Sequence, residues 1–170
     1  MKKLILIIFF LAFTSTSIAD VPHFINITKV LNSSKPGSQA QKKLQDKFKA
    51  ESNKFKKLEE SIRKEETEII SQKKAISPEE YQKKVQSLRK KVTDLQKNKQ
   101  KSFNNIAKSR NDAKQSLLKA VNPIIRKYME ENKIRIIVDN TSVIMGDKNL
   151  EITDKIIAIL NKELPTLKIN

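Results

Sequence analysis

The pattern of apolar and polar positions divides the chain into two short apolar blocks around a long, charged middle. In this middle, one series of apolar residues lies one heptad apart from Phe48 to Ile76, with Leu44 and Leu58 in the complementary heptad positions. A second series, spaced by four and three, begins at Tyr81. Such spacing lines apolar side chains along one helix face and is typical of coiled coils. The predicted seam consists of Leu44, Phe48, Phe55, Leu58, Ile62, Ile69, Ile76, Val85, Leu88, Val92, Leu95 and Ile106.

A helix start interrupts the two series. Ser77 has the character of an N-cap, Pro78 suits the first helical position, and Glu80 would complete a capping box. The short connection at 75–78 makes the two helices antiparallel neighbours. We therefore predict a helical hairpin arm over residues 38–115, with its tip near 75–78.

The seam of this hairpin is thin, because polar residues occupy four positions at or near its core. These residues are Glu51, Glu65, Gln72 and Lys99. A seam that buries little apolar surface per turn opens and bends at a lower cost than a Leu/Ile zipper. We therefore expect a flexible arm.

The flanking blocks, residues 20–37 and 116–170, form a small body. Strands are predicted at 22–28, 134–139 and 142–145, and a last helix at 154–161 with Thr153 as its cap. Pro123 lies in the stretch that leads back from the arm, and it either kinks that helix or begins a new one with Asn122 as cap.

A body of this size is marginal by itself, and short strands leave edges that must be paired or covered. The sequence therefore predicts that several copies pool their strands in one core. The fold class is α+β, mostly α, with a long antiparallel hairpin projecting from a body completed by oligomerisation. The residues expected in that body are Phe24, Ile25, Ile27, Ile134, Ile136, Ile137, Val138, Val143 and Ile144.

The N-terminal segment has the layout of a secretory signal peptide. Lys2 and Lys3 precede an apolar run over residues 4–13, and small residues follow. Ten apolar residues make a helix of about 15 Å, roughly half of a bilayer's hydrocarbon core. We predict that residues 1–19 are removed by cleavage between Ala19 and Asp20, which exports the chain to a bacterial periplasm.

The composition argues against catalysis. The 170 residues include 35 Lys and Arg against 19 Asp and Glu, a formal net charge of +16, with one histidine, two glycines and no cysteine. Without cysteine there is no disulfide, thiolate metal site or cysteine nucleophile, and two glycines leave no phosphate-binding loop. We therefore expect a protein that is not an enzyme and needs no cofactor.

The order of the segments resembles that of the Skp/OmpH-like periplasmic chaperones. The most telling segments are FINITKVLNSS (24–34), IRIIVDNTSVIMG (134–146) and LEITDKIIAILNKE (150–163), which flank the Lys-rich hairpin. The resemblance implies a homotrimer whose strands form a central body. It also implies that three arms enclose a cavity that holds unfolded outer-membrane proteins without ATP. It carries over no catalytic residues.

The arm offers two means of holding such clients. Residues 41–114 contain 22 Lys and Arg against 11 Asp and Glu, a net charge of +11, and the long apolar stem of lysine can cover a client's apolar surface. Ile70 and Phe103 fall beside the seam, and Tyr81 sits near the tip. These three are the candidates for direct client contact. Ordinary packing in a locally shifted register is the alternative for each of them, and for Phe103 it has at least equal weight.

Two other classes of function fit the charge. The sequence pI of about 9.9 permits a nucleic-acid binder, but the export signal and the five arginines among 35 basic residues argue against specific recognition of nucleic acid. A basic coiled-coil tether that binds a polyanion, such as lipopolysaccharide or anionic lipid, stays open. A holdase, unlike either alternative, would suppress aggregation of an unfolded barrel protein at stoichiometric ratio.

Overall fold

A computed structural model describes residues 21–167 of the chain and confirms a mostly helical α+β fold. The predicted signal peptide and its cleavage site at Ala19–Asp20 lie outside the described residues. Along the chain the elements are β1 (His23–Ile25), α2 (Ile27–Ser33), α3 (Lys35–Gln72), α4 (Pro78–Glu131), β2 (Ile137–Asp139), the 3-10 turns η1 (Asn140–Ser142) and η2 (Lys148–Leu150), and α5 (Thr153–Glu163).

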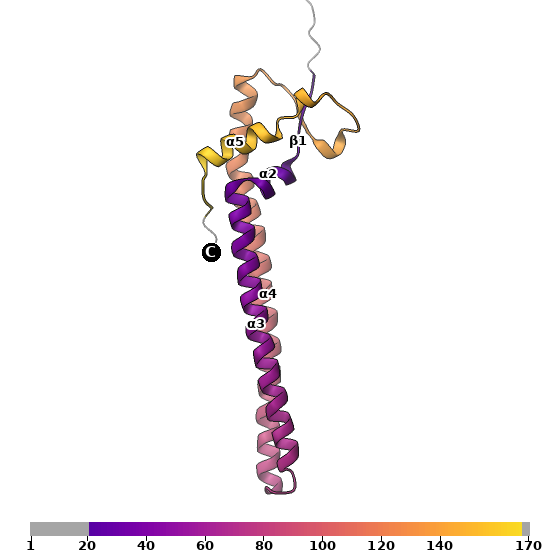
Figure 1. Cartoon of the computed structure of the whole chain (residues 1–170), viewed down its shortest axis with the longest axis vertical. Coiled ribbons are helices and arrows are strands. Elements are labelled where there is room, and N and C mark those ends of the chain that lie inside the picture. Colours follow the sequence, from indigo (N-terminus) through magenta and orange to yellow (C-terminus); the bar gives the residue numbers. More distant parts are fainter. Residues whose placement is uncertain (1–20, 168–170) are drawn as a thin grey trace, which may run out of the picture.

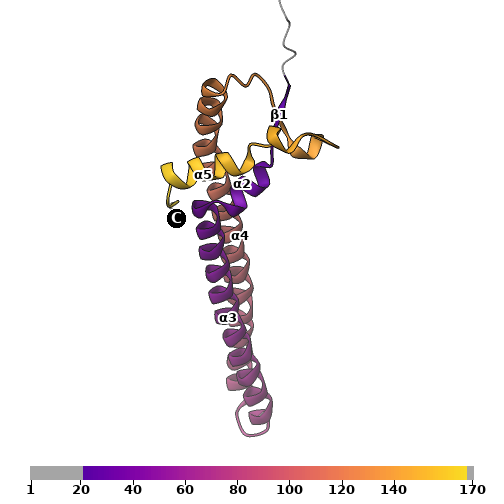
Figure 2. The ribbon, with the colours of Figure 1, turned by 45° about the horizontal axis from the view of Figure 1, so that its top comes forward.

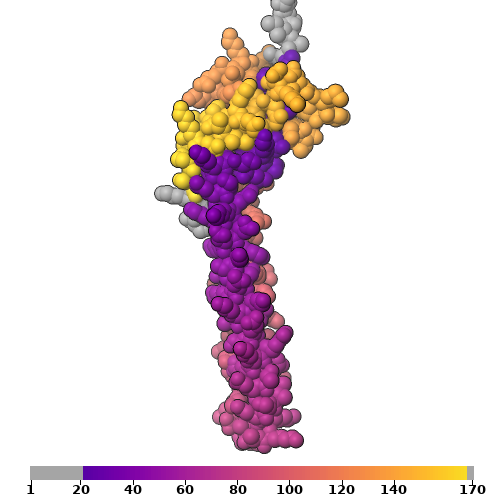
Figure 3. All heavy atoms as spheres, in the orientation of Figure 1, coloured from indigo at the N-terminus to yellow at the C-terminus, as the bar shows by residue number. Residues whose placement is uncertain are grey.

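Helices α3 and α4 form the long hairpin, and they run side by side over the whole length of α3 (Figures 1 and 2). The predicted helix start is confirmed, because the Ser77 hydroxyl accepts a hydrogen bond from the Glu80 main-chain N–H at 3.1 Å and Pro78 occupies the first helical position. The 38 residues of α3 give the arm a length of about 57 Å. Figure 3 shows this slender arm beneath a broader body.

Pro123 does not begin a new helix, because α4 continues through it to Glu131. A proline inside a helix lacks the N–H that would bond to the preceding turn. The loss is tolerated here because the neighbouring residues are held by tertiary packing: Val121 is fully buried and Ile124 is 6% exposed. Asn122 is therefore an interior helical residue rather than a cap.

The strands are shorter than predicted. The first strand ends at Ile25 instead of continuing to 28, because the Asn26 side chain accepts a hydrogen bond from the Lys29 N–H at 2.7 Å and caps α2. The second strand begins at Ile137 instead of 134. The two pair in parallel, with Phe24 opposite Val138, and Glu151 forms an isolated bridge to Phe24.

The third predicted strand, at 142–145, is wrong. The Asp139 carboxylate accepts hydrogen bonds from the Thr141 main-chain N–H at 2.9 Å and from its hydroxyl at 2.6 Å, and it caps the 3-10 turn η1. This capping turns the backbone out of the extended conformation directly after β2. The β-branched residue Val143 is consequently placed after a turn rather than in a ladder.

The core of the body lies where α5 crosses α4 beside α2 (Figure 1). Helix α5 begins at Thr153 and ends at Glu163, slightly longer than predicted, and Ile152 occupies the cap position in place of Thr153. The buried Thr153 hydroxyl instead accepts a hydrogen bond from the Asn26 N–H at 2.9 Å. The buried cluster consists of Ile25, Val30, Val121, Ile124, Ile134, Ile152, Ile156 and Leu160.

Candidate client-binding surface

The seam of the arm is apolar and buried at intervals. Leu44, Phe55, Ile69 and Ile106 are each at least nine-tenths buried, at positions that the heptad pattern predicts. The half-buried seam residues are Ile62, Ile76, Val85, Leu88 and Leu95. The interface between the two helices thus follows the predicted stripe but buries full side chains in only part of the described arm.

Three predicted seam residues are exposed. Phe48 is 50% exposed, Leu58 is 43% exposed and Val92 is 36% exposed. Phe48 still contacts the opposite helix, because its ring centroid lies 5.2 Å from that of Phe103. A pair of helices has no third or fourth helix to cover the margins of its seam, so large side chains at those margins remain accessible to solvent.

Each of the four polar residues predicted in the seam has a hydrogen-bonding partner on the opposite helix. The pairs are Glu51–Ser102 at 2.9 Å, Glu65–Lys91 at 2.7 Å, Gln72–Lys84 at 2.7 Å and Lys99–Glu59 at 2.7 Å. Exposed ion pairs contribute little to stability, about 0.2–1 kcal/mol each. Their geometry nevertheless specifies which residues of α3 and α4 face each other, and so fixes the register of the hairpin.

Two of the three client-contact candidates lie together near the tip of the arm. Ile70 and Tyr81 line one groove of about 580 Å³, which we call the tip groove. Its other lining residues are Ile62, Glu66, Ile69, Val85, Leu88, Arg89, Val92 and Thr93. Ile70 is 60% exposed, and the Lys73 ammonium lies 5.7 Å from the centre of the Tyr81 ring. The tip groove is therefore an apolar surface with one acidic and one basic side chain among its lining residues.

The third candidate, Phe103, lies elsewhere. Its ring centroid is 5.2 Å from that of Phe48 and 5.9 Å from that of Phe55, which places it inside the seam rather than beside it. This arrangement is the packing alternative that the sequence left open. The heptad pattern missed it because the aromatic ring reaches the seam from a flanking position.

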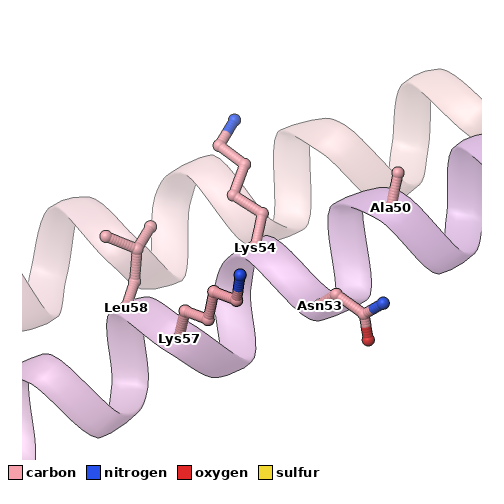
Figure 4. A pocket seen from close by; sticks show the side chains of 5 residues that line it. All are labelled: Ala50, Asn53, Lys54, Lys57 and Leu58. Atoms are coloured by element: carbon pink, nitrogen blue, oxygen red, sulfur yellow. The ribbon is translucent and has the colours of Figure 1, made fainter.

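A second accessible surface, on the middle of the arm, was not predicted. Figure 4 shows its first part, a shallow pocket of about 490 Å³ on α3 lined by Ala50, Asn53, Lys54, Lys57 and Leu58. An adjoining pocket of about 460 Å³ shares Lys54 and Leu58 and extends to Lys101 on α4. We call these two pockets the mid-arm surface. The signal for it was Leu58, a seam position with a lysine one residue before it and another four before it.

The predicted oligomer-body residues occupy three environments. Ile25 and Ile134 are buried in the core of the chain's own body, and Ile27 and Ile137 pack against that core. Partly buried residues are Phe24, Val138 and Val143. Ile136 is 51% exposed, Ile144 is fully exposed, and the neighbouring Met145 is 92% exposed. The segment around β2 and η1 therefore leaves large apolar side chains uncovered within the single chain.

Two classes of feature are absent from the described part of the chain. Among residues 21–167, no three His, Cys, Asp or Glu side chains are grouped so that they could hold a metal ion. In the same residues, no helix combines the length and the apolar character needed to cross a membrane.

Comparison with known proteins gives one family and one fold. The model of the family described as "Outer membrane protein (OmpH-like)" matches residues 23–160. No curated protein matches the chain. Among solved structures, a crystal structure titled as an OmpH-like outer membrane chaperone from Caulobacter crescentus CB15 superposes with a TM-score of 0.82. It shares 17% sequence identity and covers 94% of this chain and 95% of the other, which shows a common fold.

Proposed function

This chain belongs to the OmpH-like family of chaperones, and we propose that it acts in the periplasm as an ATP-independent holdase for unfolded outer-membrane proteins. The observation that carries the proposal is the coexistence on one arm of exposed apolar grooves and a large excess of positive charge. A holdase needs numerous weak contacts that do not depend on client sequence. The tip groove and the mid-arm surface offer such contacts.

The charge of the arm supports the capture of clients. Four ion pairs join side chains within the arm, whereas residues 41–114 carry 22 basic side chains, so most of the lysines are available to a partner. A concave surface of one sign concentrates partners of opposite sign and raises their encounter rate. Lysine stems such as those of Lys54 and Lys57 can also cover apolar client surface beside Leu58.

The proposed assembly is a homotrimer in which the bodies pack together and the arms enclose the client. The exposed Ile136, Ile144 and Met145 support it, because large apolar side chains left uncovered on a single chain can be buried by packing against another copy. Sedimentation of the mature protein should give three times the mass of one chain. Ile144→Ser should lower that mass, and a wild-type monomer at micromolar concentration would contradict the proposed assembly.

The test of holdase activity is to dilute a urea-unfolded barrel protein into buffer with the mature protein and to follow light scattering. We expect suppression near one trimer per client. Ile70→Ser should weaken suppression while leaving the helical content unchanged, and the exposed neighbour Ser71→Ala is the matched control. Normal aggregation at both low and moderate salt, with intact helical content, would refute the proposal and favour a tether that binds polyanions.

A further inference from the structure

The arm carries another groove at its root, where α2 meets α3 and α4. This groove encloses about 600 Å³, a volume within the range of roughly 300–1,000 Å³ that is usual for small-molecule sites. Its floor consists of Leu31, Ala40, Leu44, Ala113 and Leu117, each at least nine-tenths buried. We call it the root groove. Because alanines on α3 and α4 face it, a narrow apolar chain can approach both helices closely.

Positive charge lines one side of the root groove. Arg110 and Lys114 lie one turn apart on α4, and both border the groove, whose lining includes neither Asp nor Glu. Within the described chain neither of the two forms an ion pair. Like charges four residues apart on a helix repel each other, and an anion between them would relieve the repulsion. The groove is therefore complementary to an apolar molecule with an anionic end.

The walls of the root groove suit a ligand whose body carries no hydrogen-bonding groups. They are helical, so their main-chain N–H and C=O groups are occupied within the helices and offer no partners to hydrogen-bonding groups of a ligand. Two of the three side-chain amides in its lining are engaged with each other, since Gln41 Nε2 donates to Asn32 Oδ1 at 2.6 Å. A hydrocarbon chain carries no such groups and loses nothing on burial there.

We propose that the root groove binds a long-chain fatty acid. Its hydrocarbon lies along Ala40, Ala113 and Leu117, and its carboxylate lies between Arg110 and Lys114. Guanidinium and ammonium groups form charge-assisted hydrogen bonds with carboxylates, and the planar guanidinium can do so through two N–H groups at once. This site is separate from the tip groove and the mid-arm surface, so it stands whether or not the chain is a holdase.

The test uses cis-parinaric acid, a fatty acid whose fluorescence rises in an apolar site, with the full mature protein. We expect saturable binding of one molecule per chain and displacement by palmitate. The double variant Arg110→Glu/Lys114→Glu should weaken binding by at least about tenfold, because it replaces two attractive contacts with repulsive ones. The matched control is Lys90→Glu/Lys97→Glu, which changes two exposed lysines on the same helix by the same net charge; neither lines the root groove, the tip groove or the mid-arm surface, and the variant should bind within twofold of wild type.

Circular dichroism must show that both double variants keep the helical content of the wild type. If that content falls in the first variant, Lys114→Gln alone replaces it and should still weaken binding severalfold. Equal binding by the wild type and the root-groove variant would overturn the proposal, as would equal weakening by the control. Displacement by an acidic, apolar peptide but not by palmitate would assign the groove to polypeptide instead and would also refute it.

Discussion

Phe103 offers the sharpest test of how the arm is built, because its two possible roles predict opposite results. The ring packs against Phe48 and Phe55, with centroid distances of 5.2 Å and 5.9 Å, in the middle of the hairpin. If it holds α3 to α4, then Phe103→Ala must destabilise the arm. If the ring instead contacts a client, then Phe103→Ala must weaken the suppression of client aggregation and leave the stability of the arm unchanged.

The magnitude follows from the contacts. Each aromatic pair contributes about 0.5–1.5 kcal/mol beyond the burial of its surface. A fully buried Phe→Ala change costs about 3–5 kcal/mol, and Phe103 is only partly buried, which sets an upper bound. We therefore expect Phe103→Ala to lower the free energy of unfolding by about 2–3 kcal/mol.

The assay is urea unfolding followed by circular dichroism at 222 nm, with amide exchange to locate the loss. Protection should fall along the middle of α3 and α4 and stay unchanged in α5. Ile70→Ala is the control, because a side chain that is 60% exposed should change stability by less than about 0.5 kcal/mol. Phe103→Leu should restore part of the stability by refilling the seam.

One result would refute this reasoning. An unchanged urea midpoint for Phe103→Ala, combined with lost suppression of client aggregation, would mean that the ring serves the client and that the seam does not depend on it. Loss of stability with suppression restored in Phe103→Leu would support packing.

Three further predictions concern the arm and the body. Lys99→Ala removes the 2.7 Å pair with Glu59 and should lower the free energy of unfolding by about 0.2–1 kcal/mol in 50 mM NaCl. In 1 M NaCl, where the screening length is about 3 Å, the loss should almost vanish, and equal shifts of the urea midpoint at both salt concentrations would contradict this. Gly37→Ala should lower the free energy of unfolding by about 1–3 kcal/mol, and the thermal midpoint with it, since an added methyl group would overlap a main-chain carbonyl of α2. An unchanged midpoint would contradict the overlap. The Thr141 hydroxyl and N–H donate to the Asp139 carboxylate and lower its pKa. This carboxylate therefore stabilises the body at neutral pH and loses that contribution as the pH falls through the lowered pKa. Thr141→Val should raise the pKa of Asp139 in an NMR titration, and an unchanged pKa would refute the assignment.

The hairpin could be predicted from the sequence because its determinants are local. The Ser77–Pro78 start depends on a cap and on a proline that suits the first turn, and both act within four residues. The heptad pattern likewise needs only the periodicity of a helix. Pro123 shows the limit of such local rules, because its tolerance inside α4 depends on the burial of Val121 and Ile124 against α5 and α2.

The strands could be predicted less accurately than the hairpin, because side-chain capping competed with β-propensity. Residues 24–28 and 142–145 are rich in β-branched and apolar side chains, yet Asn26 and Asp139 each accept hydrogen bonds that turn the backbone. The Thr153 hydroxyl was expected to cap its own helix, but its partner is the Asn26 N–H, 127 residues away. A contact at that separation leaves no trace in a local pattern.

The polar seam connects the architecture of the arm to the function we propose for it. An all-apolar seam would hold α3 and α4 in a deep energy minimum, and a client could not spread them at small cost. The four cross-hairpin polar pairs specify the register of the helices through geometry, but each contributes little free energy because water can replace it. An arm of this kind keeps a defined resting shape and can still bend locally when a client supplies competing contacts. A seam converted to leucine at Glu51, Glu65, Gln72 and Lys99 should therefore be more stable and a poorer holdase, whereas equal or better suppression by that variant would separate flexibility from function.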